Sequence, residues 1–150
     1  MHSYRYRPND NYLYEATWDD LLFLAKKWKS ELTLYTYDLK YLEQEVDASF
    51  ETLLIYEDPI ELRELKRDIE IYIVQCSILL KRVPSIINQL TFATKEPDVY
   101  NSTNFRKELE LFEDDYSMYI ESVKVLRLIV LLKLKNISQK VKPEYYWKMN

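Results

Sequence analysis

The chain has 150 residues, 47% of them hydrophobic and 31% charged, with a formal net charge of −4. We expect a single domain over residues 1–150, because this length buries a core without disulfides or metals. The chain has no glycine, which argues against β-rich folds and nucleotide-binding loops, since both normally need positive-φ turns.

The first predicted element is a long helix over residues 18–56. Thr17 followed by Asp20 resembles a capping box, which marks a helix start. From residue 21 to residue 53, apolar residues recur in alternating steps of four and three, and only Ser49 is polar. That 3.5-residue period is typical of helices that pack along a shared line, and we call these residues the seam positions.

The second predicted helix covers residues 59–93 and has the sharpest start signal in the chain. Asp58 is a good N-cap residue, and Pro59 suits the first helical position. Its seam positions, from residue 62 to residue 90, are apolar or tyrosine throughout. Pro84 falls inside this helix, where a proline removes one backbone hydrogen bond, so we expect a bend there but no break.

The third predicted helix covers residues 103–140 and should end before Pro143. Its seam positions run from residue 105 to residue 137, with Lys133 as the only charged member. The short link at residues 57–58 predicts that the first two helices are antiparallel neighbours. The fold class is therefore all-α: an up-down-up antiparallel bundle of three long helices with heptad packing and short polar and aromatic tails.

One segment of the first helix resembles a known group of proteins. The run Trp28-Lys29-Ser30-Glu31-Leu32, continuing through Tyr35, Asp38 and Leu42, is similar to the first helix of small bacterial helical-bundle proteins of uncharacterised function. The resemblance covers about a tenth of the chain. It implies a helical fold and no particular activity.

The lack of a secretory signal and of a cysteine pair predicts a cytoplasmic location. The N-terminus lacks the apolar core of a secretory signal, and the single Cys76 cannot form an intramolecular disulfide. The densest apolar run, residues 125–134, is about half the length of a membrane span and contains Arg127 and Lys133. We expect no segment that crosses a membrane.

A second set of apolar residues lies opposite the seam positions, where a three-helix bundle does not need them. Such a surface predicts an interface, most simply in a homo-oligomer, with a dimer favoured. The alternative is that the tail residues 145–147 fold back over it. The residues predicted to form the interface are Leu34, Tyr37, Tyr41, Ile71, Ile78, Leu111, Met118, Val125, Leu128, Leu131 and Leu132.

The C-terminal segment has the opposite charge to the rest of the chain. From residue 122 onward there are seven Lys or Arg residues and one acid, Glu144. Such a segment can bind nucleic acid or an anionic surface, but cations at a helix C-terminus also complement the helix dipole. We favour the second interpretation, and nucleic acid is not the expected partner. The cations are Lys124, Arg127, Lys133, Lys135, Lys140, Lys142 and Lys148.

Catalytic and metal chemistry finds little support in the sequence, so we expect no enzymatic activity, no cofactor and no metal. The only histidine is His2, and Cys76 at a seam position has no histidine partner. A second alternative is a magnesium-dependent all-α nucleotide hydrolase with Glu-x-x-Glu pairs, for which Glu61 with Glu64 and Glu110 with Glu113 have the spacing. Charged helices produce such pairs easily, so we expect all four carboxylates on solvated faces.

Overall fold

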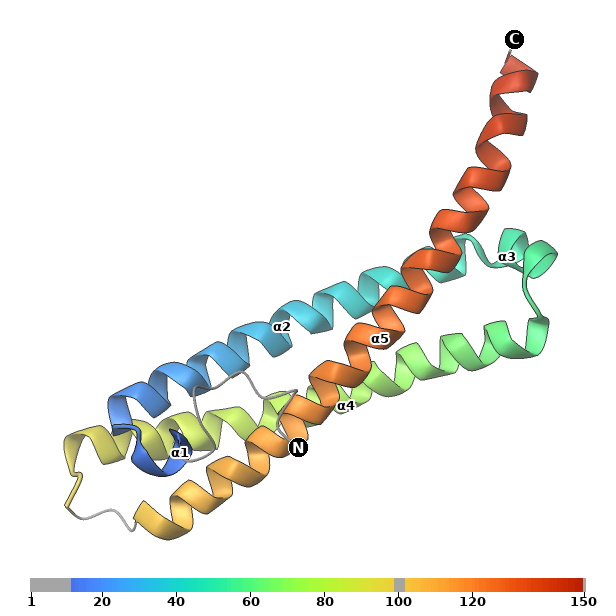
Figure 1. The fold of residues 1–150 in the computed structure, drawn as a ribbon. Coiled ribbons are helices and arrows are strands. Elements are labelled where there is room, and N and C mark those ends of the chain that lie inside the picture. Colours follow the sequence, from blue (N-terminus) through green and yellow to red (C-terminus); the bar gives the residue numbers. More distant parts are fainter. Residues whose placement is uncertain (1–11, 99–101, 150) are drawn as a thin grey trace. The chain divides into compact units, whose positions relative to one another are not determined.

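The computed structural model describes residues 12–98 and 102–149. Within these residues the regular structure is entirely helical, in five helices with no strand (Figure 1), which confirms the all-α class. No helix in this part of the chain is long and apolar enough to cross a membrane. The helices are α1 (Tyr12–Glu15), α2 (Trp18–Ala48), α3 (Phe50–Tyr56), α4 (Pro59–Lys95) and α5 (Ser102–Met149).

The starts of α2 and α4 lie where the capping residues predict them. The backbone N–H of Asp20 donates a hydrogen bond to Oγ1 of Thr17 at 3.1 Å. The N–H of Ile60 donates to Oδ1 of Asp58 at 3.4 Å, and Pro59 occupies the first position of α4. Each side chain thus satisfies one backbone donor that the first turn of a helix leaves without a helical acceptor.

The prediction of one continuous helix over residues 18–56 is wrong, because Ser49 separates α2 from α3. Ser49 has φ −100° and ψ 5°, outside the helical region. The interruption is confined to this residue: Ser49 N–H still donates to the Glu45 carbonyl at 3.1 Å, and Leu53 N–H donates to the Ser49 carbonyl at 2.8 Å. The apolar period continues across Ser49 for this reason, and Leu53 is buried as predicted.

The predicted end of the third helix, near residue 140, is also wrong. Helix α5 continues through Pro143 to Met149. A proline removes one backbone donor, but the hydrogen bonds of the neighbouring turns can hold a helix together across it. The side chains of residues 141–149 lie outside the described part, as do residues 1–11, so the predicted cover by residues 145–147 and the tail residue His2 are not described.

The helices form two compact units. Among the described residues, unit 1 comprises residues 12–35, 75–98 and 102–121, and unit 2 comprises residues 36–74 and 122–149. In unit 1 the core is rich in aromatic side chains: Trp28 lies 4.9 Å from Phe112 and 6.0 Å from Tyr116, measured between ring centroids. In unit 2 the core is aliphatic, with buried side chains such as Leu42, Val46 and Val130.

Nearly all seam positions are buried in their respective units. Four of them are half-buried instead: Tyr35, Ser49, Tyr72 and Lys133. Helix α4 is continuous through Pro84, so the proline does not break it. The described residues contain no cis peptide and no residue with positive φ, as expected of a chain without glycine.

Helix α1, which the sequence analysis did not predict, is fastened to α5 within unit 1. Nη1 of Arg106 donates hydrogen bonds to the carbonyls of Leu13 at 2.9 Å and Ala16 at 2.8 Å. The same guanidinium lies 4.2 Å from the ring centre of Trp18, which packs on Phe105. Partial burial lowers the pKa of Arg106 from its usual value, since desolvation penalises its charged form. Leu13 is fully buried as a result of this arrangement.

Candidate interaction surface

Most residues predicted to form an interface have exposed side chains, and Leu131 alone is half-buried. Four of the eleven belong to unit 1 and seven to unit 2. The unit 1 residues are Leu34, Ile78, Leu111 and Met118, and the unit 2 residues are Tyr37, Tyr41, Ile71, Val125, Leu128, Leu131 and Leu132. They lie on three different helices, so the structure does not gather them on one helix face.

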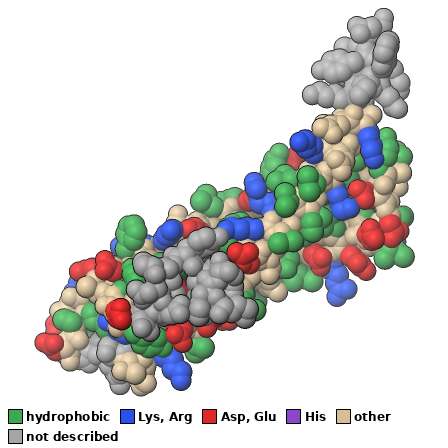
Figure 2. Space-filling model, in the orientation of Figure 1, with side chains coloured by type: hydrophobic (Ala, Val, Ile, Leu, Met, Phe, Trp, Pro, Cys, Tyr) green, Lys and Arg blue, Asp and Glu red, His purple; other side chains and the backbone are tan. Residues whose placement is uncertain are grey.

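The densest group lies on α5 in unit 2, and we call it the α5 stripe: Val125, Leu128, Ile129 and Leu132. Their exposed fractions are 58%, 58%, 41% and 49%. The spacing of three, four and seven residues places them on one face across two helical turns. On the side of unit 2 that Figure 2 shows, hydrophobic side chains lie along α5 with Lys and Arg side chains beside them.

The α5 stripe is exposed because the opposite face of the helix already fills the core of unit 2. Val123, Leu126 and Val130 are at most 5% exposed. Leu131 lies between the two faces and is therefore half-buried. Ile129 belongs to the stripe but was not among the residues that the sequence analysis predicted to form the interface. The spacing of three to four residues around Ile129 could have identified it.

The remaining exposed residues form smaller groups. Tyr37 and Tyr41, one turn apart on α2, are 69% and 56% exposed. On α4, Ile71 and Val74 are 41% and 58% exposed. In unit 1, Leu111 and Met118 stand two turns apart on α5, and neither continues into a stripe. With four members, the α5 stripe is thus the largest group of exposed apolar side chains on one helix face within a single unit, among the described residues.

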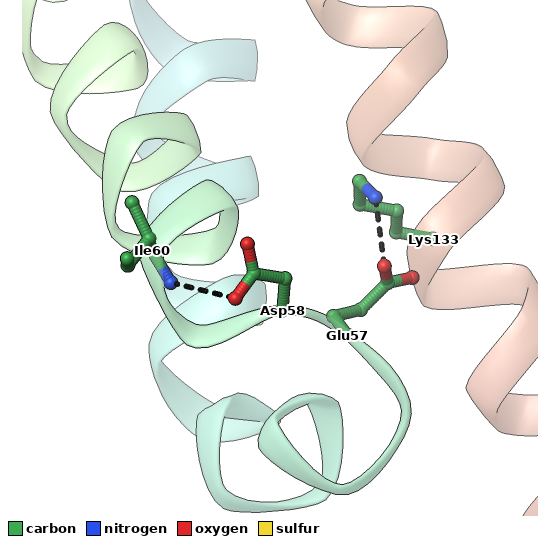
Figure 3. A network of polar contacts seen from close by, with 4 residues as sticks. All are labelled: Glu57, Asp58, Ile60 and Lys133. Atoms are coloured by element: carbon green, nitrogen blue, oxygen red, sulfur yellow. Dashed lines mark hydrogen bonds and ion pairs between the residues drawn. The ribbon is translucent and has the colours of Figure 1, made fainter.

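Several cations of the basic segment bind acidic or aromatic groups within unit 2. Nε of Arg127 lies 2.7 Å from Oδ2 of Asp38. Nζ of Lys133 lies 2.9 Å from Oε2 of Glu57. Figure 3 draws this ion pair as a dashed line. Nζ of Lys140 lies 4.5 Å from the ring centre of Tyr56. The described part of the segment therefore uses much of its charge to attach α5 to its own unit, while the side chains of Lys142 and Lys148 lie outside the described residues.

The two Glu-x-x-Glu pairs belong to different units. Glu61 and Glu64 are exposed in unit 2, whereas Glu110 is half-buried and Glu113 is 5% exposed in unit 1. The expectation of a solvated face is thus wrong for Glu113, because α5 buries a wider face in unit 1 than its seam positions require, including Ser117. Among the described side chains, no three His, Cys, Asp or Glu residues are placed to hold a metal ion.

The other candidate groups lie in the core of unit 1. The Cys76 thiol is buried and donates a hydrogen bond to the Leu32 carbonyl at 3.2 Å, which is an arrangement typical of a structural cysteine. The Tyr116 hydroxyl donates to a carboxylate oxygen of Glu31, and Arg82 pairs with Asp115 at 2.8 Å. These contacts join neighbouring helices, and they suit packing better than catalysis.

Comparison with known proteins adds no identification. No protein-family model, no curated protein and no solved structure matches the chain.

Proposed function

We propose that this protein is a non-enzymatic interaction or scaffold module that associates with itself through an exposed apolar helix face, with a dimer favoured. The observation that carries the proposal is the α5 stripe. Four large aliphatic side chains are each 41–58% exposed on one helix face. Burying the part of such a side chain that is still exposed contributes on the order of 1 kcal/mol to the free energy of association. A partner that covers all four side chains is stabilised by each of them.

We also propose the relative directions of the helices and the way in which they pack within each unit. Within each unit, α2 and α5 run parallel, α4 runs antiparallel to both, and the seam positions pack in heptad fashion. In unit 1, Trp18 contacts Phe105 and, further along both helices, Trp28 contacts Phe112. The two-residue link at Glu57 and Asp58 then reverses the chain between α3 and α4.

In this arrangement the α5 stripe lies on one face of an unbroken helix. A continuous helix holds Val125 and Leu132 about 10 Å apart at 1.5 Å per residue. A preorganised face of this kind binds with little loss of conformational entropy. Self-association is the simplest use of it, since closed twofold pairs are the commonest oligomers.

Size-exclusion chromatography with light scattering tests the proposal. We expect the wild-type protein to be a dimer at micromolar concentrations, and the Leu128→Asp and Leu132→Asp variants to be monomers with unchanged helical circular dichroism. Phe23→Asp is the matched control, because Phe23 is 75% exposed on α2 in unit 1 and lies outside the stripe. A wild-type protein that stays monomeric at every concentration would refute the proposal.

A further inference from the structure

We infer that the α5 stripe docks on the outer face of α4 in a second copy of this chain, with the lysines beside the stripe facing the acids Glu61, Glu64 and Asp68. This inference rests on the proposed self-association and names its two surfaces. It follows from the distribution of charge within unit 2 and from the order of residues around the two helices.

The charges of unit 2 are segregated by helix. Residues 122–140 of α5 contain five Lys or Arg residues and no acid. Residues 36–74, which supply the other helices of the unit, contain eleven acids and four Lys or Arg residues. Two α5 stripes placed against each other would therefore bring together only cations. The complementary surface is an acidic helix of the second copy.

The outer face of α4 provides apolar side chains and acids together. Ile60, Ile71 and Val74 are 65%, 41% and 58% exposed. Along one edge of this face, Glu61, Glu64 and Asp68 recur at intervals of three and four residues, and all three side chains are exposed. We call these three the acidic edge. It includes the Glu61-x-x-Glu64 pair, of which Glu61 also lies in the first turn of α4, where a carboxylate complements the helix dipole.

The edges of the two faces match in one direction only. Each residue of an α-helix is rotated by about 100° from the residue before it. Measured in this direction of rotation, Lys124 and Lys135 lie just before the α5 stripe. The acidic edge lies just after the apolar face of α4. When two facing helices run parallel, the preceding edge of one meets the following edge of the other. Parallel docking therefore brings the lysines to the acidic edge, whereas antiparallel docking would bring them to an edge of mixed charge that contains Arg63 and Glu70.

Parallel docking is also compatible with a closed pair. Within one copy, α4 and α5 run antiparallel under the proposed arrangement. A twofold axis perpendicular to the helices then makes α5 of each copy parallel to α4 of the other. The same contact occurs twice in such a dimer, so no surface is left to recruit a third copy.

Charge reversal tests the inference with two complementary variants. Lys124→Glu combined with Lys135→Glu makes both faces of the contact negative, and Glu64→Lys combined with Asp68→Lys makes both positive. We expect the dimer dissociation constant, measured by sedimentation equilibrium at low salt, to rise at least about tenfold for each variant separately. An equimolar mixture of the two variants should form a heterodimer with nearly wild-type affinity, because both of its contacts pair opposite charges.

The control is Lys26→Glu combined with Lys29→Glu, which changes the net charge by the same amount as Lys124→Glu with Lys135→Glu, but at exposed positions of α2 in unit 1. If the wild-type protein is a dimer and both reversed variants dimerise like this control, the inference fails while the proposed function stands. Tighter association of the Lys124→Glu, Lys135→Glu variant would instead indicate pairing between two α5 stripes. A monomeric wild-type protein that sediments with phosphatidylserine vesicles would overturn both proposals in favour of an anionic lipid surface.

Discussion

Nζ of Lys133 on α5 lies 2.9 Å from Oε2 of Glu57, in the link between α3 and α4, and the two side chains are only 25% and 21% exposed. Lys133 is the charged member of the α5 seam positions, and Glu57 brings a carboxylate to it from a segment 76 residues away. Asp58, the next residue, caps α4 (Figure 3). Two adjacent acids thus contact two different helices: Glu57 pairs with Lys133 of α5, and Asp58 caps α4.

The first prediction concerns this ion pair. Glu57→Gln should lower the free energy of unfolding by about 1–2 kcal/mol, because it leaves the Lys133 ammonium half-buried without its carboxylate. Urea denaturation measures the change. Glu51→Gln, at an exposed position of α3, is the control and should change stability by less than about 0.5 kcal/mol. In a Lys133→Met background, Glu57→Gln should have a clearly smaller effect, and an undiminished effect would show that the two side chains are not coupled.

The second prediction compares two leucines that lie two residues apart on α5. Leu109 is fully buried, whereas Leu111 is 54% exposed. Leu109→Ala should destabilise the protein by about 2–5 kcal/mol, because it removes buried contacts and leaves a cavity. Leu111→Ala should change stability by no more than about 0.5 kcal/mol. Thermal and urea unfolding of both variants would contradict the assigned faces of α5 if the order of the two effects were reversed.

The third prediction addresses the attachment of α1. Arg106→Ala removes two hydrogen bonds to the carbonyls of Leu13 and Ala16 and the contact with Trp18. We expect a loss of about 1–3 kcal/mol in the free energy of unfolding. Amide hydrogen exchange in residues 12–16 should accelerate more than exchange elsewhere in unit 1.

Arg106→Lys serves as a second variant in that experiment. One ammonium could donate to both carbonyls, as Nη1 does, but it cannot stack on the Trp18 indole as a planar guanidinium does, so lysine should restore only part of the loss. Arg63→Ala, at an exposed position of α4, is the control. Unchanged exchange in residues 12–16 of Arg106→Ala would mean that α1 is held by other contacts.

The fourth prediction concerns Pro84, an exposed residue inside the continuous helix α4. Pro84→Ala supplies the missing backbone donor and removes the clash of the proline ring with the preceding turn, so it should stabilise the protein by about 1–3 kcal/mol. Chemical denaturation provides the measurement, with Ser85→Ala as the neighbouring control. A destabilised Pro84→Ala variant would show that the packing of unit 1 requires the helix geometry that the proline imposes.

The helical class and the buried positions could be predicted because apolar period and capping are local properties of the chain. Thr17 and Asp58 each satisfy a backbone donor within three residues, so the sequence suffices to locate both helix starts. The break at Ser49 could not be seen in the same way. Helical hydrogen bonds resume on both sides of it, and the apolar period therefore shows no change of phase.

The features that were missed depend on contacts between distant segments. The burial of Glu113 and Ser117 reflects how widely α5 is enclosed in unit 1, which spacing along one helix does not reveal. Helix α1 depends on Arg106, about 90 residues further along the chain. For the candidate surface, the sequence indicated which side chains face outward, but it did not show that the α5 stripe is the largest such group within one unit.

The absence of positive φ among the described residues has a consequence for mutagenesis and for evolutionary drift. Each of these positions has a backbone conformation that every amino acid except proline can adopt without steric penalty. A saturation library over this region would therefore measure side-chain environment with little interference from backbone intolerance. At the helix junctions, substitutions are therefore limited by side-chain contacts such as those of Glu57 and Asp58, and not by the backbone conformation.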